Sequence, residues 1–215
     1  MKFEPGMKVV SSEGKNVGEI QRVVIDPVTK SVSHVVIEKG LLFRDDRVLP
    51  VNLIQETQGK EATLRINADE LGDLPKFEVT EYVRLNEEEQ EEMPNPGVVP
   101  FYPMAPVPVW KPGLTMTLES GEPLIEETER NIPTGEVALK EGADILDLDG
   151  KKVGEVDELL TNPESDQITD VIISRGTILK EEKRIPITWV SHIDEKAIHL
   201  AVGPKILENL PTWKE

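Results

Sequence analysis

The three histidines are the first residues to examine for chemistry, because imidazole suits both proton transfer and metal binding near neutral pH. They are His34, His192 and His199, and the chain has no cysteine. A metal or catalytic site needs convergent partners at a regular spacing. These histidines are loosely spaced and have no symmetrical counterparts, so we expect no metal site, no cofactor and no catalytic residue.

A group of aspartates before Gly150 faintly resembles a calcium-binding loop. With Gly150 as loop position six, however, positions one and twelve fall on Ile145 and Val156, which cannot supply carboxylates. A tight hairpin turn explains the aspartates better. The nucleophile motif Gly-x-Ser-x-Gly and the dinucleotide motif Gly-x-Gly-x-x-Gly are absent, and Gly14-Lys15 lacks the upstream glycine of a phosphate-binding loop. We therefore expect a protein that is not an enzyme.

Apolar side chains in expected loops are the better candidates for function, as contacts for a protein partner. They are Leu41, Leu42, Phe43, Ile178, Leu179, Phe101, Tyr102 and Trp110. Those near residues 42 and 178 either pack against the other half of the chain or dock a partner. The aromatic residues between 101 and 110 either pack back onto a domain or are recognised by another protein.

The elements that position these residues come from a duplication. When the sequence is shifted by 136 residues, residues 142–213 align with residues 6–77 without a gap, and sixteen positions are identical. Each copy contains short β-branched runs separated by turn signals, followed by one short helix. This pattern predicts two all-β domains, each a small antiparallel barrel. Glycines and prolines at equivalent positions are expected to shape both copies: Gly14, Gly18, Pro50, Gly150, Gly154 and Pro186.

The pattern in both copies resembles the PRC-barrel family. The shared features are Gly-Lys-x-Val-Gly-Glu, a turn with Asp-Pro or Asn-Pro, a β-branched run, a glycine, and a final Leu-Pro-Val or Ile-Pro-Ile. The resemblance implies a fold similar to the cytoplasmic domain of the reaction centre H subunit and to the C-terminal domain of RimM. Neither role transfers, because the chain lacks an N-terminal membrane helix and a recognisable RNA-associated domain. We expect domains at 1–84 and 132–215, with a linker at 85–131.

The linker is acidic and then rich in proline. Pro100, Pro103 and Pro106 follow at intervals of three, which is typical of a polyproline II helix. We therefore expect an extended spacer that sets the distance or the docking between the barrels. Residues 78–85 are expected to extend or pair with the first barrel, and residues 124–139 to lead into the second.

The composition of the chain argues against several classes of binding partner. The net charge of −17 disfavours nucleic acid, anionic lipid and acidic partners, and no segment has the length and apolarity of a membrane span. We expect a cytoplasmic adaptor or scaffold that binds a protein of unknown identity, without direct membrane insertion, and compatible with a homo-oligomer. The alternative is an accessory or assembly factor for a photosynthetic or other membrane-associated complex.

Overall fold

The computed structural model describes residues 1–38, 46–84, 114–115, 124–175 and 181–213. The chain divides into two compact units, one formed by Met1–Phe77 with Asn131–Glu215 and the other by Glu78–Arg130. Both sequence repeats therefore belong to one unit. The segment between them forms the second unit.

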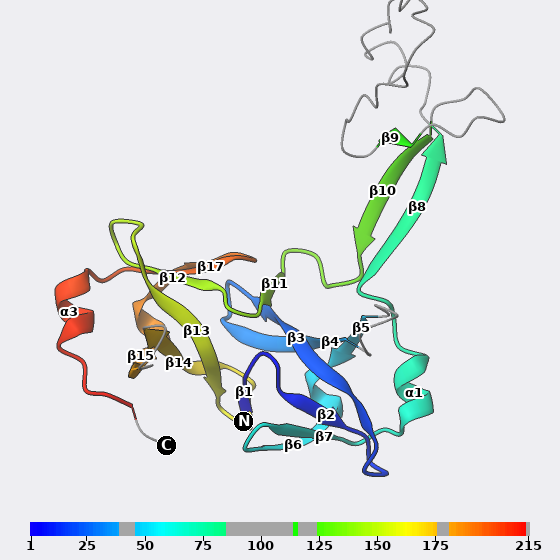
Figure 1. Cartoon of the computed structure of the whole chain (residues 1–215), viewed down its shortest axis with the longest axis horizontal. Coiled ribbons are helices and arrows are strands. Elements are labelled where there is room, and N and C mark those ends of the chain that lie inside the picture. Colours follow the sequence, from blue (N-terminus) through cyan, green and yellow to red (C-terminus); the bar gives the residue numbers. More distant parts are fainter. Residues whose placement is uncertain (39–45, 85–113, 116–123, 176–180, 214–215) are drawn as a thin grey trace, which may run out of the picture. The chain divides into compact units, whose positions relative to one another are not determined.

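The first repeat forms a curled sheet whose hydrogen-bonded order is β5-β4-β3-β2-β7-β6 (Figure 1). Its elements are β2 (Lys8–Val10), β3 (Asn16–Asp26), β4 (Ser31–Glu38), β5 (Arg47–Pro50), η1 (Val51–Leu53), β6 (Ile54–Gln58), β7 (Glu61–Leu64) and α1 (Ala68–Gly72). The neighbours are antiparallel except β2 and β7, which run parallel. The expectation of a purely antiparallel barrel missed this pair, because local turn signals do not reveal which distant strands pair.

The second repeat has the same strand order, β15-β14-β13-β12-β17-β16, and the same single parallel pair, β12 with β17. Its elements are β12 (Asp144–Leu146), β13 (Lys152–Thr161), β14 (Ile168–Arg175), β15 (Glu181–Pro186), η2 (Ile187–Trp189), β16 (Val190–Ile193), β17 (Ala197–Leu200) and α3 (Pro204–Glu208). The prediction of two tandem β-barrel domains, each ending in a short helix, is confirmed.

The bend early in the long strand of each repeat lies on a glycine. A side chain at Gly18 would place its Cβ 2.2 Å from the carbonyl oxygen of Glu38, and Gly18 has a φ of +138°. The equivalent Cβ at Gly154 would lie 2.8 Å from the carbonyl oxygen of Ser174, without a positive φ. Real Cβ atoms do not approach a carbonyl oxygen so closely, so only glycine at these two positions lets the long strand lie this close to its neighbour.

A basic residue of the edge strand binds carbonyl groups at or just after the end of the terminal helix in each repeat. Arg47 donates to the carbonyl oxygen of Leu74 at 2.7 Å, and Lys183 donates to those of Leu207 and Glu208 at 2.8 and 3.0 Å. The carbonyl groups at the end of a helix lack a full set of backbone partners, so a cation placed there is favourable. The carbonyl oxygen of Leu207 also accepts from Leu210 N at 3.3 Å. Arg47 and Lys183 occupy equivalent positions in the duplication.

The second unit is a β-ribbon in which β8 (Glu78–Arg84) pairs antiparallel with β10 (Leu124–Arg130), and β9 (Leu114–Thr115) adds to β10. Arg84 lies opposite Leu124, so these two residues lie side by side although 39 residues separate them in the sequence. Within the first unit, Asn131 N donates to Phe77 O at 2.9 Å. The segment therefore does not set the distance between the barrels, contrary to the spacer prediction, and residues 78–84 pair with β10 instead of extending the first barrel.

Candidate functional site: the seam between the two repeats

Each repeat contributes a short arm that completes the sheet of the other repeat. β1 (Lys2–Phe3) pairs with β13 of the second repeat, and β11 (Val137–Lys140) pairs with β3 of the first (Figure 1). The two pairings are reciprocal in register. Phe3 lies opposite Leu159, and Leu139 lies opposite Val23, which are equivalent pairs under the shift of 136 residues. The repeats are therefore related as the halves of a twofold-symmetric dimer that exchanges strands.

The exchange is necessary because the long strands would otherwise lack a neighbour on one edge. β2 pairs with β3 only over residues 16–19, and the arm β11 takes over along residues 22–25. Phe3 and Leu139 are 0% and 1% exposed, and they belong to one apolar core that contains residues of both repeats. Burial of apolar surface is the main driving force of folding, so the two barrels share their stabilisation.

The two repeats also meet at a second reciprocal contact, around Ser31 and Gln167, which forms the centre of the seam between them. Val32 N donates to Asp166 O at 3.0 Å, and Ile168 N donates to Lys30 O at 2.9 Å, on either side of a bridge between Ser31 and Gln167. Ser31 and Gln167 are equivalent in the duplication, so the symmetry axis passes beside them. Lys30 also donates through Nζ to Val190 O at 2.6 Å.

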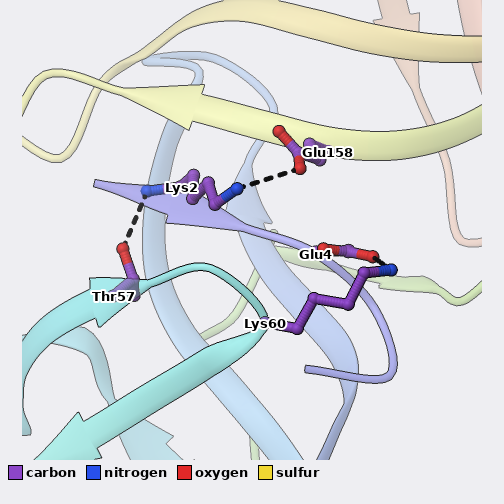
Figure 2. Close-up of polar contacts among 5 residues, drawn as sticks. All are labelled: Lys2, Glu4, Thr57, Lys60 and Glu158. Carbon is purple, nitrogen blue, oxygen red and sulfur yellow. Dashed lines mark hydrogen bonds and ion pairs between the residues drawn. The ribbon is translucent and has the colours of Figure 1, made fainter. Parts of the chain in front are cut away.

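One end of the seam carries a neutralised polar cluster, Lys2, Glu4, Thr57, Lys60 and Glu158 (Figure 2). Lys2 Nζ lies 3.2 Å from Glu158 Oε1, and both side chains are only 15% exposed, so solvent screens this pair less than an ordinary surface pair. The backbone N of Lys2 donates to Thr57 Oγ1 at 3.1 Å. Lys60 pairs with Glu4. The ammonium of Lys60 donates to the Glu4 carboxylate, and this bond raises the pKa of Lys60, with the charge of Glu4 and of the acids on β13 acting in the same direction.

The symmetry-equivalent end of the seam is basic. Arg22 takes the place of Glu158, Lys140 that of Glu4, Lys196 that of Lys60, and Ala138 that of Lys2. Arg22 and Lys140 are directly opposed in the β3–β11 ladder, and the guanidinium of Arg22 lies 5.3 Å from the centroid of the Phe77 ring. Lys140 N donates to Glu195 O at 3.2 Å, which places the turn containing Lys196 beside the arm.

His34 lies on β4 of the first repeat, whereas His192 and His199 lie on β16 and β17 of the second. His34 Nδ1 lies 2.9 Å from Ser33 Oγ, which also bonds the carboxylate of Glu136. Burial lowers the pKa of His34, and the charge of Glu136 opposes this effect. His192 and His199 are cross-strand neighbours with ring centroids 5.5 Å apart, a contact that the sequence spacing did not reveal. In the described part of the chain, no group of three or more His, Asp or Glu residues is arranged to hold a metal ion.

The aspartates before Gly150 build a turn. Asp147 Oδ1 accepts from the backbone N of Asp149 at 3.0 Å and of Lys151 at 2.9 Å. Gly150 and its equivalent Gly14 have φ values of +75° and +79°, which glycine adopts at little cost. Asp147 therefore has a local structural role, in which its side chain stabilises this turn.

The other predicted structural residues lie at sheet edges. Pro50 and Pro186 end the edge strands β5 and β15, where a missing N–H does not interrupt a ladder. The predicted interaction residues lie outside the described residues: Leu41, Leu42, Phe43, Ile178, Leu179, Phe101, Tyr102 and Trp110.

Sequence reasoning missed the exchange of the arms, because the segment ending at Leu139 was expected to join the second barrel, whereas β11 pairs with β3 of the first. The alignment of the copies began at Gly6, but its register also places Met1–Glu4 on residues 137–140. These segments share no identical residue, only two apolar positions, Met1 with Val137 and Phe3 with Leu139. Two apolar positions are a weak signal, because they do not show which sheet the segment joins.

Two curled β-sheets that complete each other through exchanged arms define a tandem barrel protein. A model of the PRC-barrel domain matches residues 6–71 and 141–204. These segments cover more than half of the chain, so the protein belongs to the PRC-barrel family, and the resemblance seen in the sequence is confirmed. Domains of this family are commonly protein-interaction modules. A comparison with proteins of curated function gave no match. No helix in the described ranges is long and apolar enough to cross a membrane.

Proposed function

We propose that the protein is a non-enzymatic adaptor or scaffold that binds a protein partner. The observation that carries this proposal is the closure of the chain at the base of the ribbon, where Asn131 N donates to Phe77 O. The two barrels are joined through their arms, so the chain does not need residues 78–130 to hold the repeats together.

A segment that scaffold assembly does not need is available for recognition. Arg84 and Leu124 are paired residues of the β-ribbon. The sequence between them contains the prolines at 100, 103 and 106 and the aromatic residues Phe101, Tyr102 and Trp110. Proline-rich sequences lose little conformational entropy when they bind, and aromatic side chains supply much of the contact energy in protein interfaces. The segment between Arg84 and Leu124 binds the partner, and the two joined barrels support that segment.

The test compares three proteins as baits in a native lysate. The first is the full chain, the second has Phe101, Tyr102 and Trp110 replaced by alanine, and the third has residues 78–130 replaced by a short glycine linker between Phe77 and Asn131. We expect a specific partner to bind the full chain and neither variant, while both variants keep the far-UV circular dichroism of folded barrels. Equal capture by the excised variant would refute the assignment to this segment. Failure of the full chain to bind any partner, together with turnover of a small molecule, would refute the adaptor role.

A further inference from the structure

The basic end of the seam places two like charges opposite each other. Arg22 and Lys140 lie directly opposite each other on neighbouring strands, so their side chains share one face of the sheet. Like charges in this arrangement destabilise a sheet. The chain has 41 acidic against 24 basic residues, so carboxylates are abundant elsewhere.

None of the three cations has an acidic partner in the described part of the chain. Within the residues that the structure describes, no ion pair joins Arg22, Lys140 or Lys196 to a carboxylate. The nearby carboxylate of Glu38 is engaged by the side-chain amide of Gln21. Arg22 Nε is buried and has no acceptor. A buried donor without a partner costs free energy.

The equivalent end of the same molecule shows the ordinary solution. There, Glu4 and Glu158 occupy the positions of Lys140 and Arg22, and each has its own lysine, Lys60 and Lys2 (Figure 2). Neutralising the basic end in the same way would require acids at positions 138 and 196. The sequence has Ala138 and Lys196 instead, so it adds a third cation where a counter-charge would stand.

We propose that Arg22, Lys140 and Lys196 form a binding site for an oxyanion, either a carboxylate of an acidic peptide or a phosphate group. The guanidinium of Arg22 lies over the ring of Phe77, 5.3 Å from its centroid, so the ring supports one face of the planar fork. A guanidinium can bind carboxylate and phosphate through two parallel hydrogen bonds. Lys140, opposite Arg22 on the neighbouring strand, and Lys196, in the turn beside that strand, add positive charge. This site stands independently of the proposed adaptor role.

The experiment titrates the full chain with two probes, a tetraglutamate peptide and inorganic phosphate, by NMR at low ionic strength. We expect shifts at the amides of residues 22, 140 and 196 that weaken as salt rises. The R22Q/K140Q variant should bind about tenfold more weakly, as expected for the loss of charge-assisted hydrogen bonds. The exposed K196Q variant tests the site without disturbing the ladder, and it should also bind more weakly.

The matched control is K8Q/K60Q, which removes two cations that already have acidic partners. Control binding equal to the unmodified chain, with weaker binding in R22Q/K140Q and in K196Q, supports the site. Tighter binding of tetraglutamate identifies an acidic peptide as the source of the anion, and tighter binding of phosphate identifies a phosphate group. No binding of either probe, or an equal loss in the control, would overturn the proposal.

Discussion

Replacing Leu139 by alanine tests whether the arm of one repeat stabilises the whole unit. Leu139 belongs to the second copy by sequence, but it pairs with Val23 of the first, and it is 1% exposed within the common core. Truncating a fully buried leucine removes its apolar surface and leaves a cavity, which costs about 2–5 kcal/mol. Because the core is continuous, this loss should appear in one cooperative transition that includes both repeats.

Urea unfolding measures this loss with two probes. Far-UV circular dichroism reports on the strands of both repeats, while tryptophan fluorescence reports on Trp189 and Trp213 of the second repeat once Trp110 is replaced by phenylalanine. The two curves should coincide in L139A and in the parent, with the midpoint shifted by the same amount for both probes.

The control is a leucine with the same chemical change at an exposed position. Leu148 is 66% exposed, so L148A should alter the free energy of unfolding by less than about 0.5 kcal/mol. Separate transitions for the two probes, or a loss in L139A no larger than in L148A, would refute the shared core.

Three further substitutions test separate features of the fold. Gly18→Ala should lose more stability than Gly154→Ala in thermal unfolding, by roughly 1–3 kcal/mol, because only Gly18 combines the closer carbonyl contact with a positive φ; equal losses would contradict this reasoning. Hydrogen bonding from Arg184 lowers the pKa of Asp170, so Asp170→Asn should lower the free energy of unfolding by roughly 1 kcal/mol at pH 7. This difference in stability from the parent should vanish as pH falls through the pKa of Asp170 in the folded state, and a difference that persists at low pH would contradict the reasoning. Burial lowers the pKa of His34, so the parent should lose stability as pH falls below about 6.5, and His34→Gln should remove part of that loss; an unchanged pH profile would contradict the shift.

The sequence predicted the parts of the fold that depend on local chemistry. The turns at Gly14 and Gly150 and the strand ends at Pro50 and Pro186 each follow from the residue's own backbone geometry, and the structure contains all of them. The duplication doubled each of these signals. The cap of α1 is equally local, because the Asn67 side chain accepts from the backbone N of Asp69 and Glu70 and the Glu70 side chain accepts from Asn67 N.

Contacts between distant parts of the chain could not be predicted in the same way. The pairing of β2 with β7 and the exchange of arms join residues distant in the chain, and their strands carry only two to four residues. Such short strands have no periodicity that selects a partner. The cross-strand contact of Arg22 and Lys140 was hidden for the same reason, because charge becomes informative only when the register is known.

The most direct test of the exchanged arms is an engineered disulfide, because the chain has no cysteine of its own. Lys2 lies opposite Leu160 of the second repeat, and opposed residues in an antiparallel pair have Cα atoms about 4.5–5.5 Å apart, within the range of a disulfide. The K2C/L160C variant should therefore form an intramolecular crosslink in the monomer under mild oxidation. The K2C/V24C variant, which places the second cysteine at the equivalent position of the first repeat, should remain reduced. Crosslinking of K2C/V24C but not of K2C/L160C would show that the arm folds back on its own repeat and would contradict the exchange.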